Sequence, residues 1–159
     1  MTDGKVFFNA AEVYQFAVRI EDNGEKFYRG VAANSADSKV RELFTSLADA
    51  EVGHKKLFQS LLDGLEAYEP PETYPGEYFE YLRAYADNII FTSQIDKELT
   101  AKVTPMEAVD FGIRRELDSI TYYLETKNVV PDAQKSKIDR IVEEERQHFV
   151  KLSQLRKTL

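Results

Sequence analysis

The sequence predicts an all-α fold, namely a four-helix bundle with a long crossover that contains an additional helix. Apolar residues recur every three or four positions through most of the chain, which is the period of amphipathic helices. Signals for β-strands are almost absent. Pro70, Pro71 and Pro75 gather between two pairs of long helical segments. A chain of 159 residues suits one core, so we expect a single domain over residues 1–159.

The first two helices are predicted at residues 9–34 and 36–64. Asn9 and Glu12 have the spacing of a capping box, which predicts that the first helix begins there. Polar residues at 34–38 interrupt the apolar pattern, so we expect a turn between the two helices.

The second half of the chain is predicted to contain the crossover and three further helices. Thr104 and Glu107 form a second capping box with Pro105 at the first helical position, which predicts a helix start there. Leu117 and Leu124 fall on the apolar stripe of this helix, so we expect them in the core. The predicted segments are a crossover loop at 64–77, a tyrosine-rich helix at 78–97, and helices at 105–127 and 131–157.

The composition argues against several classes of function. A net charge of −7, a pI near 5.0 and the lack of a basic stripe argue against nucleic-acid binding. No apolar run approaches the ~20 residues that span a bilayer, so we expect no membrane segment. The start of the chain lacks a basic region followed by an apolar stretch, which predicts a cytoplasmic location. Without cysteine, the chain cannot form disulfides or thiolate metal sites.

One glutamate lies on the apolar stripe of each long helix. Residues three or four positions apart share a helix face, and Glu21, for example, lies four residues after Ala17. Two histidines each follow such a glutamate by three residues, a spacing that lets both side chains bind one cation. The candidate catalytic and metal-ligating residues are Glu21, Glu51, His54, Glu116, Glu145 and His148.

The pattern around these residues repeats in the two halves of the chain. Residues 21–28 (EDNGEKFY) and 116–123 (ELDSITYY) each run from a glutamate to a tyrosine seven positions on. A pseudo-twofold axis that relates two such hairpins would bring all six groups to the middle of the bundle. Tyr28 and Tyr123 are candidates to hydrogen-bond the carboxylates, and filling the core is the alternative role.

Four carboxylates in an apolar core need compensation, because lost hydration costs several kcal/mol per ion. Two divalent metal ions would bring four positive charges and leave a neutral core. Glutamate and histidine suit iron, manganese or zinc better than copper(I). The sequence therefore predicts a dinuclear metal site, with a purely structural polar cluster as the alternative. Other acidic residues, such as Glu42, are expected to face solvent.

The six residues resemble the di-iron site of the ferritin-like superfamily, and their symmetric arrangement is most similar to that of rubrerythrins and bacterioferritins. The resemblance covers nearly the whole chain. It implies a non-haem di-iron oxidoreductase with two iron ions per chain, in which Fe(II) reacts with hydrogen peroxide or dioxygen in oxidative-stress defence. It also implies that Glu51 and Glu145 are terminal or chelating ligands, and that Glu21 and Glu116 are terminal or bridging ligands.

The chain also departs from these families. Typical rubrerythrins carry a four-cysteine rubredoxin-like module, so a separate rubredoxin-like protein is the expected electron donor here. Peroxide-reducing rubrerythrins have an extra carboxylate three residues past the glutamate that matches Glu116, where this chain has Ser119. Bacterioferritins bind haem through a methionine at the position of Val52, so we expect no haem. The resemblance suggests a homodimer. Iron handling without sustained turnover, or a structural zinc or manganese site, are the alternative functions.

Overall fold

The computed structural model describes residues 10–65, 76–90 and 103–159. These residues contain five α-helices and no strand, which confirms the all-α prediction. A π-helical turn, η1 (Ala86–Ile90), follows the third helix, and a 3₁₀ turn, η2 (Lys127–Val129), follows the fourth of the five. The helices are α1 (Ala10–Asn34), α2 (Ser38–Asp63), α3 (Gly76–Tyr85), α5 (Pro105–Thr126) and α6 (Asp132–Arg156).

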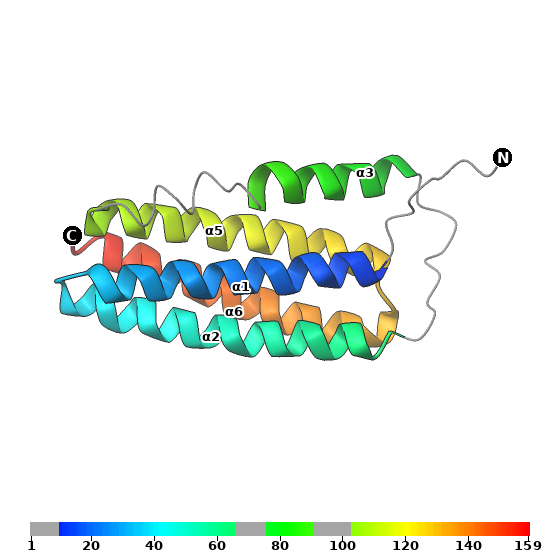
Figure 1. Ribbon diagram of the computed structural model, residues 1–159, viewed down its shortest axis with the longest axis horizontal. Helices are drawn as coiled ribbons and strands as arrows, with labels where there is room; N and C mark the ends of the chain where they lie inside the picture. The colour runs from blue at the N-terminus through cyan, green and yellow to red at the C-terminus, as the bar shows by residue number, and fades with distance from the viewer. Residues whose placement is uncertain (1–9, 66–75, 91–102) are drawn as a thin grey trace.

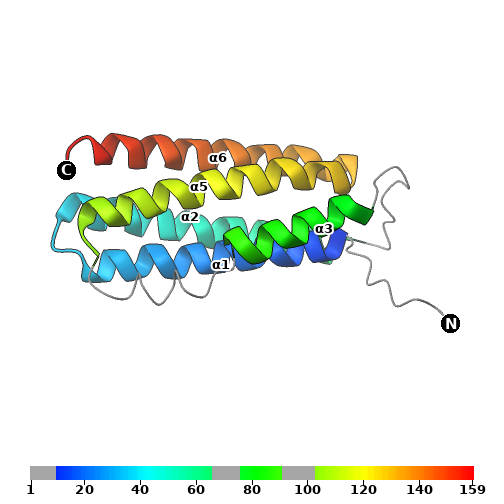
Figure 2. The same ribbon diagram turned by 90° about the horizontal axis from the view of Figure 1, so that it is seen from above.

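The four long helices lie side by side along the long axis of the molecule, as Figure 1 shows. Helices α1 and α2 form one hairpin, and α5 and α6 form the other. Helix α1 packs on α5 and α2 packs on α6, so each hairpin contacts the other through both of its helices. The short helix α3 lies on the outside of the bundle against α5 (Figure 2). The predicted four-helix bundle with an additional helix in the crossover is therefore confirmed.

Local capping explains where two of the long helices begin. The Asp37 side chain accepts hydrogen bonds from the backbone N–H groups of Lys39 and Val40, so α2 starts at Ser38. At α5, the Thr104 hydroxyl accepts from the Glu107 N–H, while the Glu107 carboxylate accepts from the Thr104 N–H. This second capping box is the one predicted from the sequence.

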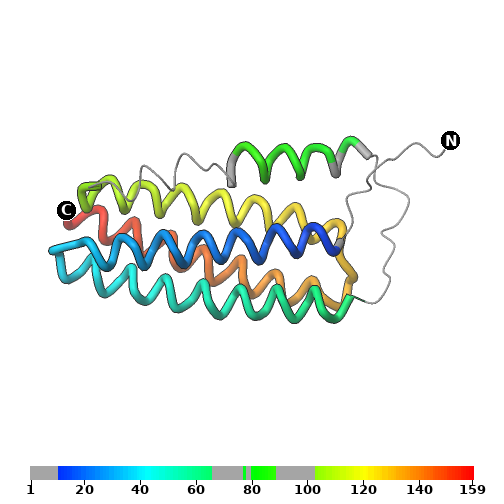
Figure 3. The backbone as a smooth tube through the Cα atoms, viewed as in Figure 1, coloured from blue at the N-terminus to red at the C-terminus, as the bar shows by residue number. Residues whose placement is uncertain are grey.

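Several predicted boundaries change or lie outside the described residues. The tyrosine-rich helix was predicted at 78–97, but α3 already begins at Gly76, and η1 continues it to Ile90. Residues 91–97 lie outside the described residues. So do Asn9, which would have completed the first capping box, and residues 66–75 of the predicted crossover loop. The tube in Figure 3 traces the described course of the chain through the reversals at both ends of the bundle.

Leu117 and Leu124 lie on the surface, so their predicted core positions are wrong. Their exposed fractions are 45% and 41%. Each follows a buried residue, Glu116 or Tyr123, by one position, which is about 100° around a helix. The helical period was correct, but it does not fix which line along α5 faces the bundle axis.

The apolar core is divided into two clusters along the bundle axis. One cluster includes Val13, Tyr14, Phe58 and Ile138, and the other includes Phe44 and other residues nearer the opposite end. On each long helix, a buried glutamate lies between residues of the first cluster and residues of the second. The bundle therefore carries a buried polar layer near its middle. No helix in the described part of the chain is long and apolar enough to cross a membrane.

Candidate metal centre

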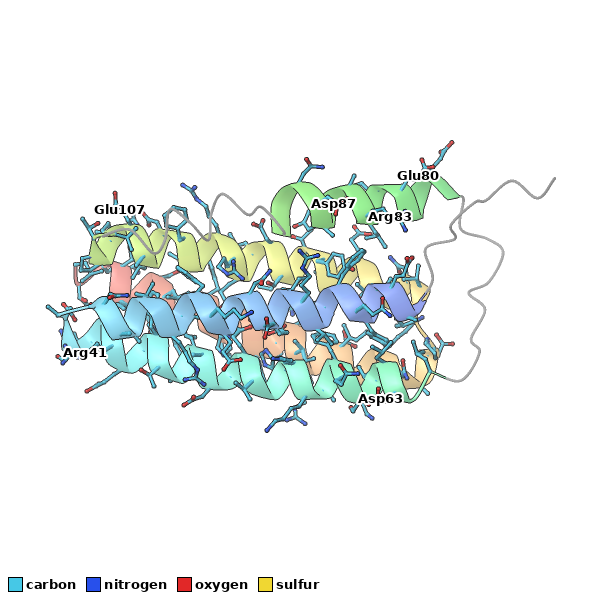
Figure 4. All side chains as sticks on the ribbon, in the orientation of Figure 1. Arg41, Asp63, Glu80, Arg83, Asp87 and Glu107 are labelled. Carbon is cyan, nitrogen blue, oxygen red and sulfur yellow. The ribbon has the colours of Figure 1, made fainter. Side chains whose placement is uncertain are left out.

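The polar layer contains all six candidate residues from the sequence. Their exposed fractions lie between 0% for Glu21 and 6% for His148. Other acidic residues behave differently, since Asp63, Glu80 and Glu107 lie on the outside of the bundle in Figure 4. The layer takes one glutamate from each long helix and one histidine each from α2 and α6: Glu21, Glu51, His54, Glu116, Glu145 and His148.

The six side chains form two overlapping groups that could each hold a metal ion. Within each group, one ligand atom from every residue lies within 4.8 Å of the others. Glu51 and Glu145 belong to both groups, whereas Glu21 and Glu116 belong to one each. Glu51 and Glu145 would therefore serve two neighbouring metal positions, whereas Glu21 and Glu116 would each serve one. The groups are Glu21, Glu51, His54 and Glu145, and Glu51, Glu116, Glu145 and His148.

Both histidines direct Nδ1 into the cluster. His54 Nδ1 lies 3.0 Å from Glu145 Oε1 and 3.5 Å from Glu21 Oε2. His148 Nδ1 lies 3.2 Å from Glu145 Oε2 and 3.6 Å from Glu116 Oε1. The two imidazole rings stack with centroids 5.7 Å apart. His54 can therefore offer one nitrogen to a cation held by carboxylates of α1 and α6. His148 can do the same for a cation held by carboxylates of α5 and of its own helix, α6.

Three buried atoms in this layer have no hydrogen-bond partner, namely Glu21 Oε2, His54 Nδ1 and Glu145 Oε1. An unsatisfied buried polar atom costs about 1–3 kcal/mol, and more when the group is charged. The three atoms face one another at the distances given above. A metal ion among them would satisfy all three at once, so the residues present fit a bound metal.

Two tyrosines hold the outer glutamates across the interface between α1 and α5. The Tyr28 hydroxyl on α1 donates a 2.5 Å hydrogen bond to Glu116 Oε1 on α5. The Tyr123 hydroxyl on α5 donates to Glu21 Oε1 on α1. The predicted hydrogen bonds are therefore present, and each tyrosine bonds the glutamate of the opposite helix.

Comparison with known proteins agrees with this geometry. The family model described as Rubrerythrin matches residues 12–156. The chain belongs to the rubrerythrin family. A crystal structure described as that of a ferritin-like diiron-carboxylate protein from Thermotoga maritima is similar, with a TM-score of 0.69 and 25% sequence identity. That alignment covers 95% of this chain and 96% of the other. The comparison with curated proteins gives no match.

In this rubrerythrin-family chain, the metal-free cluster holds extra protons. Burial lowers the pKa of both histidines, but neighbouring carboxylates outweigh it and raise the pKa of His54 to about 12 and of His148 to about 9. Burial, followed by repulsion from nearby carboxylates, raises the pKa of Glu51 and Glu116 well above the usual range. Protons thus neutralise part of the charge that metal ions would otherwise balance.

Glu145 behaves differently from these four groups. Burial raises its pKa, but the neighbouring Glu116, His148 and His54 outweigh burial and hold the pKa of Glu145 well below its usual range. Glu145 therefore stays ionised at the centre of the cluster, where both candidate groups share it.

A small cavity of about 10 Å³ lies beside the cluster, between α1, α2 and α5, and it has room for about one water molecule. Its lining includes Gly24 and Ser119, which lie three residues after Glu21 and Glu116, together with Glu51. A Cβ atom added at Gly24 would lie 2.9 Å from Glu51 Oε2. The lack of a side chain at Gly24 therefore leaves room for the Glu51 carboxylate.

The structure also reveals a residue that the sequence analysis did not single out. Glu144 Oε2 on α6 lies 2.7 Å from His54 Nε2 on α2. Glu144 directly precedes the candidate ligand Glu145, and it lies four residues before His148. This spacing alone could have indicated that Glu144 lies at the edge of the buried face of α6. Its contact with His54 could not be predicted in this way, because it depends on how α2 and α6 pack.

Proposed function

We propose that the chain is a non-haem di-iron oxidoreductase in which Fe(II) reacts with hydrogen peroxide or dioxygen in oxidative-stress defence. The observation that carries this proposal is the pair of overlapping four-residue groups that share Glu51 and Glu145. The unsatisfied buried atoms of the cluster support a bound cation. Membership of the rubrerythrin family and the likeness to a structure described as a diiron-carboxylate protein support iron over other metals.

The two candidate groups define two metal positions. When bound, two Fe(II) ions supply the two electrons that, with two protons, reduce one hydrogen peroxide molecule to two water molecules. Glu51 and Glu145 would contribute to both positions. Position 1 would be completed by Glu21 and His54, and position 2 by Glu116 and His148.

The rest of the bundle would position the ligands and limit what reaches them. Tyr28 and Tyr123 hold Glu116 and Glu21 through hydrogen bonds. The two apolar clusters close off the layer along the bundle axis. The cavity beside Gly24 and Ser119 has room for a molecule of about the size of water, which suits a small oxidant.

The partners proposed for this activity follow from the composition and the family. The chain has no cysteine with which to hold a rubredoxin-type iron. We therefore include a separate rubredoxin-like protein as electron donor, together with a homodimeric assembly, as parts of the proposal.

Ser119 favours a second candidate function, which is iron binding or ferroxidase-type iron handling without sustained turnover. Ser119 lines the cavity next to Glu116, where a peroxide-reducing rubrerythrin would carry a further carboxylate. A hydroxyl group cannot replace that carboxylate as a charged ligand. A structural zinc or manganese site uses the same ligands and is a third candidate.

Anaerobic loading of the metal-free protein with two equivalents of Fe(II), followed by hydrogen peroxide, tests the proposal. We expect Fe(III) absorption to develop much faster than for free Fe(II), and to recur after each cycle of reduction. One fast oxidation that retains iron but cannot be repeated with reductant would favour the iron-handling candidate. Failure to bind two ions per chain would reject both iron functions.

Glu51→Ala and Glu42→Ala provide the matched variants for this experiment. Both glutamates lie on α2, but Glu51 is buried in both candidate groups and Glu42 is exposed. We expect Glu51→Ala to lose iron and fast oxidation, while Glu42→Ala keeps both. Equal iron content in the two variants would reject the assigned site.

A further inference from the structure

The two halves of the metal centre are not equivalent, although the ligands repeat. Glu51 and His54 on α2 correspond to Glu145 and His148 on α6. The residue directly before Glu145 is Glu144, whereas the residue directly before Glu51 is Ala50. One half of the repeat therefore carries an extra carboxylate where the other carries a methyl group.

That extra carboxylate contacts a histidine of the other hairpin. His54 directs Nδ1 to Glu145 and Glu21, while Nε2 on the far side of the ring lies 2.7 Å from Glu144 Oε2. A carboxylate at this distance accepts the Nε2 proton. It thereby leaves Nδ1 as the nitrogen with a free lone pair when His54 is neutral, and it fixes the orientation of the ring.

Glu144 is itself held in place. Its other oxygen, Oε1, accepts a 3.2 Å hydrogen bond from Arg140 Nε one turn earlier on α6. The Glu144 side chain is 38% exposed, so its charge remains solvated while one oxygen reaches His54. Arg140 and His54 thus occupy one oxygen each.

His148 has a different environment. The polar contacts that connect it to the described residues run through Nδ1 to Glu145 and Glu116. Ala50 occupies the place equivalent to Glu144, and a methyl group accepts no hydrogen bond. Within the described part of the chain, the Nε2 atom of His148 therefore lacks the carboxylate that His54 has.

We propose that Glu144 is a positioning residue that makes the two metal positions unequal, so that position 1 binds a divalent cation more tightly than position 2. The inference rests on the proposed two-metal site. A carboxylate that accepts the outer N–H of a ligating histidine raises the donor strength of the inner nitrogen. Loss of such a partner lowers metal affinity by about 10- to 100-fold, which sets the expected difference between the two positions.

Titration of the metal-free protein with Co(II) tests the inference without any measurement of activity. Calorimetry and the visible absorption of Co(II) would report each binding step. We expect the wild type to bind two ions in two resolved steps. Glu144→Ala should weaken the first step by about 10- to 100-fold and leave the second unchanged. The affinity of the first step in Glu144→Gln should lie between those of the wild type and Glu144→Ala, because an amide oxygen still accepts a hydrogen bond from Nε2–H.

The reverse substitution separates this role from general damage to the bundle. Ala50→Glu places a carboxylate at the position before Glu51, where pseudo-symmetry directs it to His148. We expect it to tighten the second step towards the first, an effect that a loss of stability does not produce. Glu143→Gln is the charge control, since Glu143 is exposed on α6 and pairs with Arg146 rather than with a histidine.

The outcomes distinguish this inference from the proposed function. If the wild type binds two ions but Glu144→Ala matches Glu143→Gln in both steps, Glu144 has no such role and the two-metal site stands. A uniform weakening of both steps by Glu144→Ala would also overturn the inference. If the wild type binds fewer than two Co(II) ions, the proposed two-metal site itself fails.

Discussion

Tyr28 on α1 donates a hydrogen bond of 2.5 Å to Glu116 on α5, across the interface between the two hairpins. Tyr123 on α5 returns the same interaction to Glu21 on α1. Each tyrosine donates to the glutamate of the opposite helix, not to the glutamate seven residues earlier on its own helix. The crossed pairs therefore connect the hairpins directly beside the metal centre.

Removal of one hydroxyl should weaken metal binding and also lower the stability of the fold. Tyr123→Phe leaves Glu21 without its donor, so we expect metal affinity to fall by about 10-fold or more. We expect a cost of about 1–3 kcal/mol in the free energy of unfolding. Tyr14→Phe is the control, because Tyr14 is equally buried but donates to Gln134 on α6 and not to a candidate metal ligand. An equal loss of Co(II) affinity in both variants would contradict the prediction.

The number of metal ions lost should depend on which glutamate is removed. Glu51 belongs to both candidate groups, so Glu51→Ala should reduce the metal content from two ions per chain towards zero. Glu21 belongs to one group, so Glu21→Ala should leave about one ion bound. Elemental analysis after dialysis would measure both values. Retention of one ion by Glu51→Ala would show that this carboxylate does not contribute to both positions.

A methyl group at Gly24 should disturb the centre without harm to the helix. Gly24→Ala places a Cβ atom 2.9 Å from Glu51 Oε2, so the carboxylate must move. Gly30→Ala lies on the same helix and meets no atom within 4 Å. Both changes should favour the helix by up to about 1 kcal/mol, yet only Gly24→Ala should slow oxidation by peroxide and weaken metal binding. Identical oxidation rates in the two variants would contradict this.

The metal-free protein should become less stable as the pH rises from 6 to 9. The pKa of His148 rises from 6.5 to about 9 in the folded chain, and that of His54 rises to about 12. A raised pKa contributes stability that is fully present below the unfolded value near 6.5 and is lost as the pH approaches the folded value. The raised pKa values of Glu51 and Glu116 act in the same direction.

Thermal melting of metal-free and zinc-loaded protein at pH 6 and pH 9 would test this prediction. Metal ions replace the protons, so the loaded protein should lose less stability and the difference between the two forms should widen with pH. The lowered pKa of Glu145 makes the stability depend on pH only at acid pH, because this group is ionised in both the folded and the unfolded state above pH 6. If the melting temperature of the metal-free protein rises between pH 6 and pH 9, the raised pKa values given to the histidines and to Glu51 and Glu116 are contradicted.

The sequence alone was sufficient to predict that the six polar side chains lie together in the bundle. A glutamate on an apolar stripe is costly, so its repetition on four helices indicated one shared site. Which helices lie next to one another could not be predicted from the same pattern. Glu144 is one of many acidic residues and is partly exposed, and its contact with His54 depends on α2 lying next to α6.

Leu117 and Leu124 show a second limit of sequence patterns. Apolar periodicity predicted the helix correctly, but it did not determine which neighbouring line of residues faces inward. The partners of Tyr28 and Tyr123 show the same limit, because the repeat predicted hydrogen bonds to carboxylates without indicating that they cross between helices.

The division of the apolar core into two clusters has a consequence for how the protein responds to iron supply. Without metal ions, the polar layer between the two packed apolar clusters depends on bound protons for part of its charge balance. In the metal-free protein, exchange of backbone amide hydrogens should then accelerate first in the helix turns around the polar layer and only later at the two ends of the bundle. Loss of metal would thus loosen the chain from within, so we expect proteases to cleave the metal-free protein faster than the metal-loaded protein.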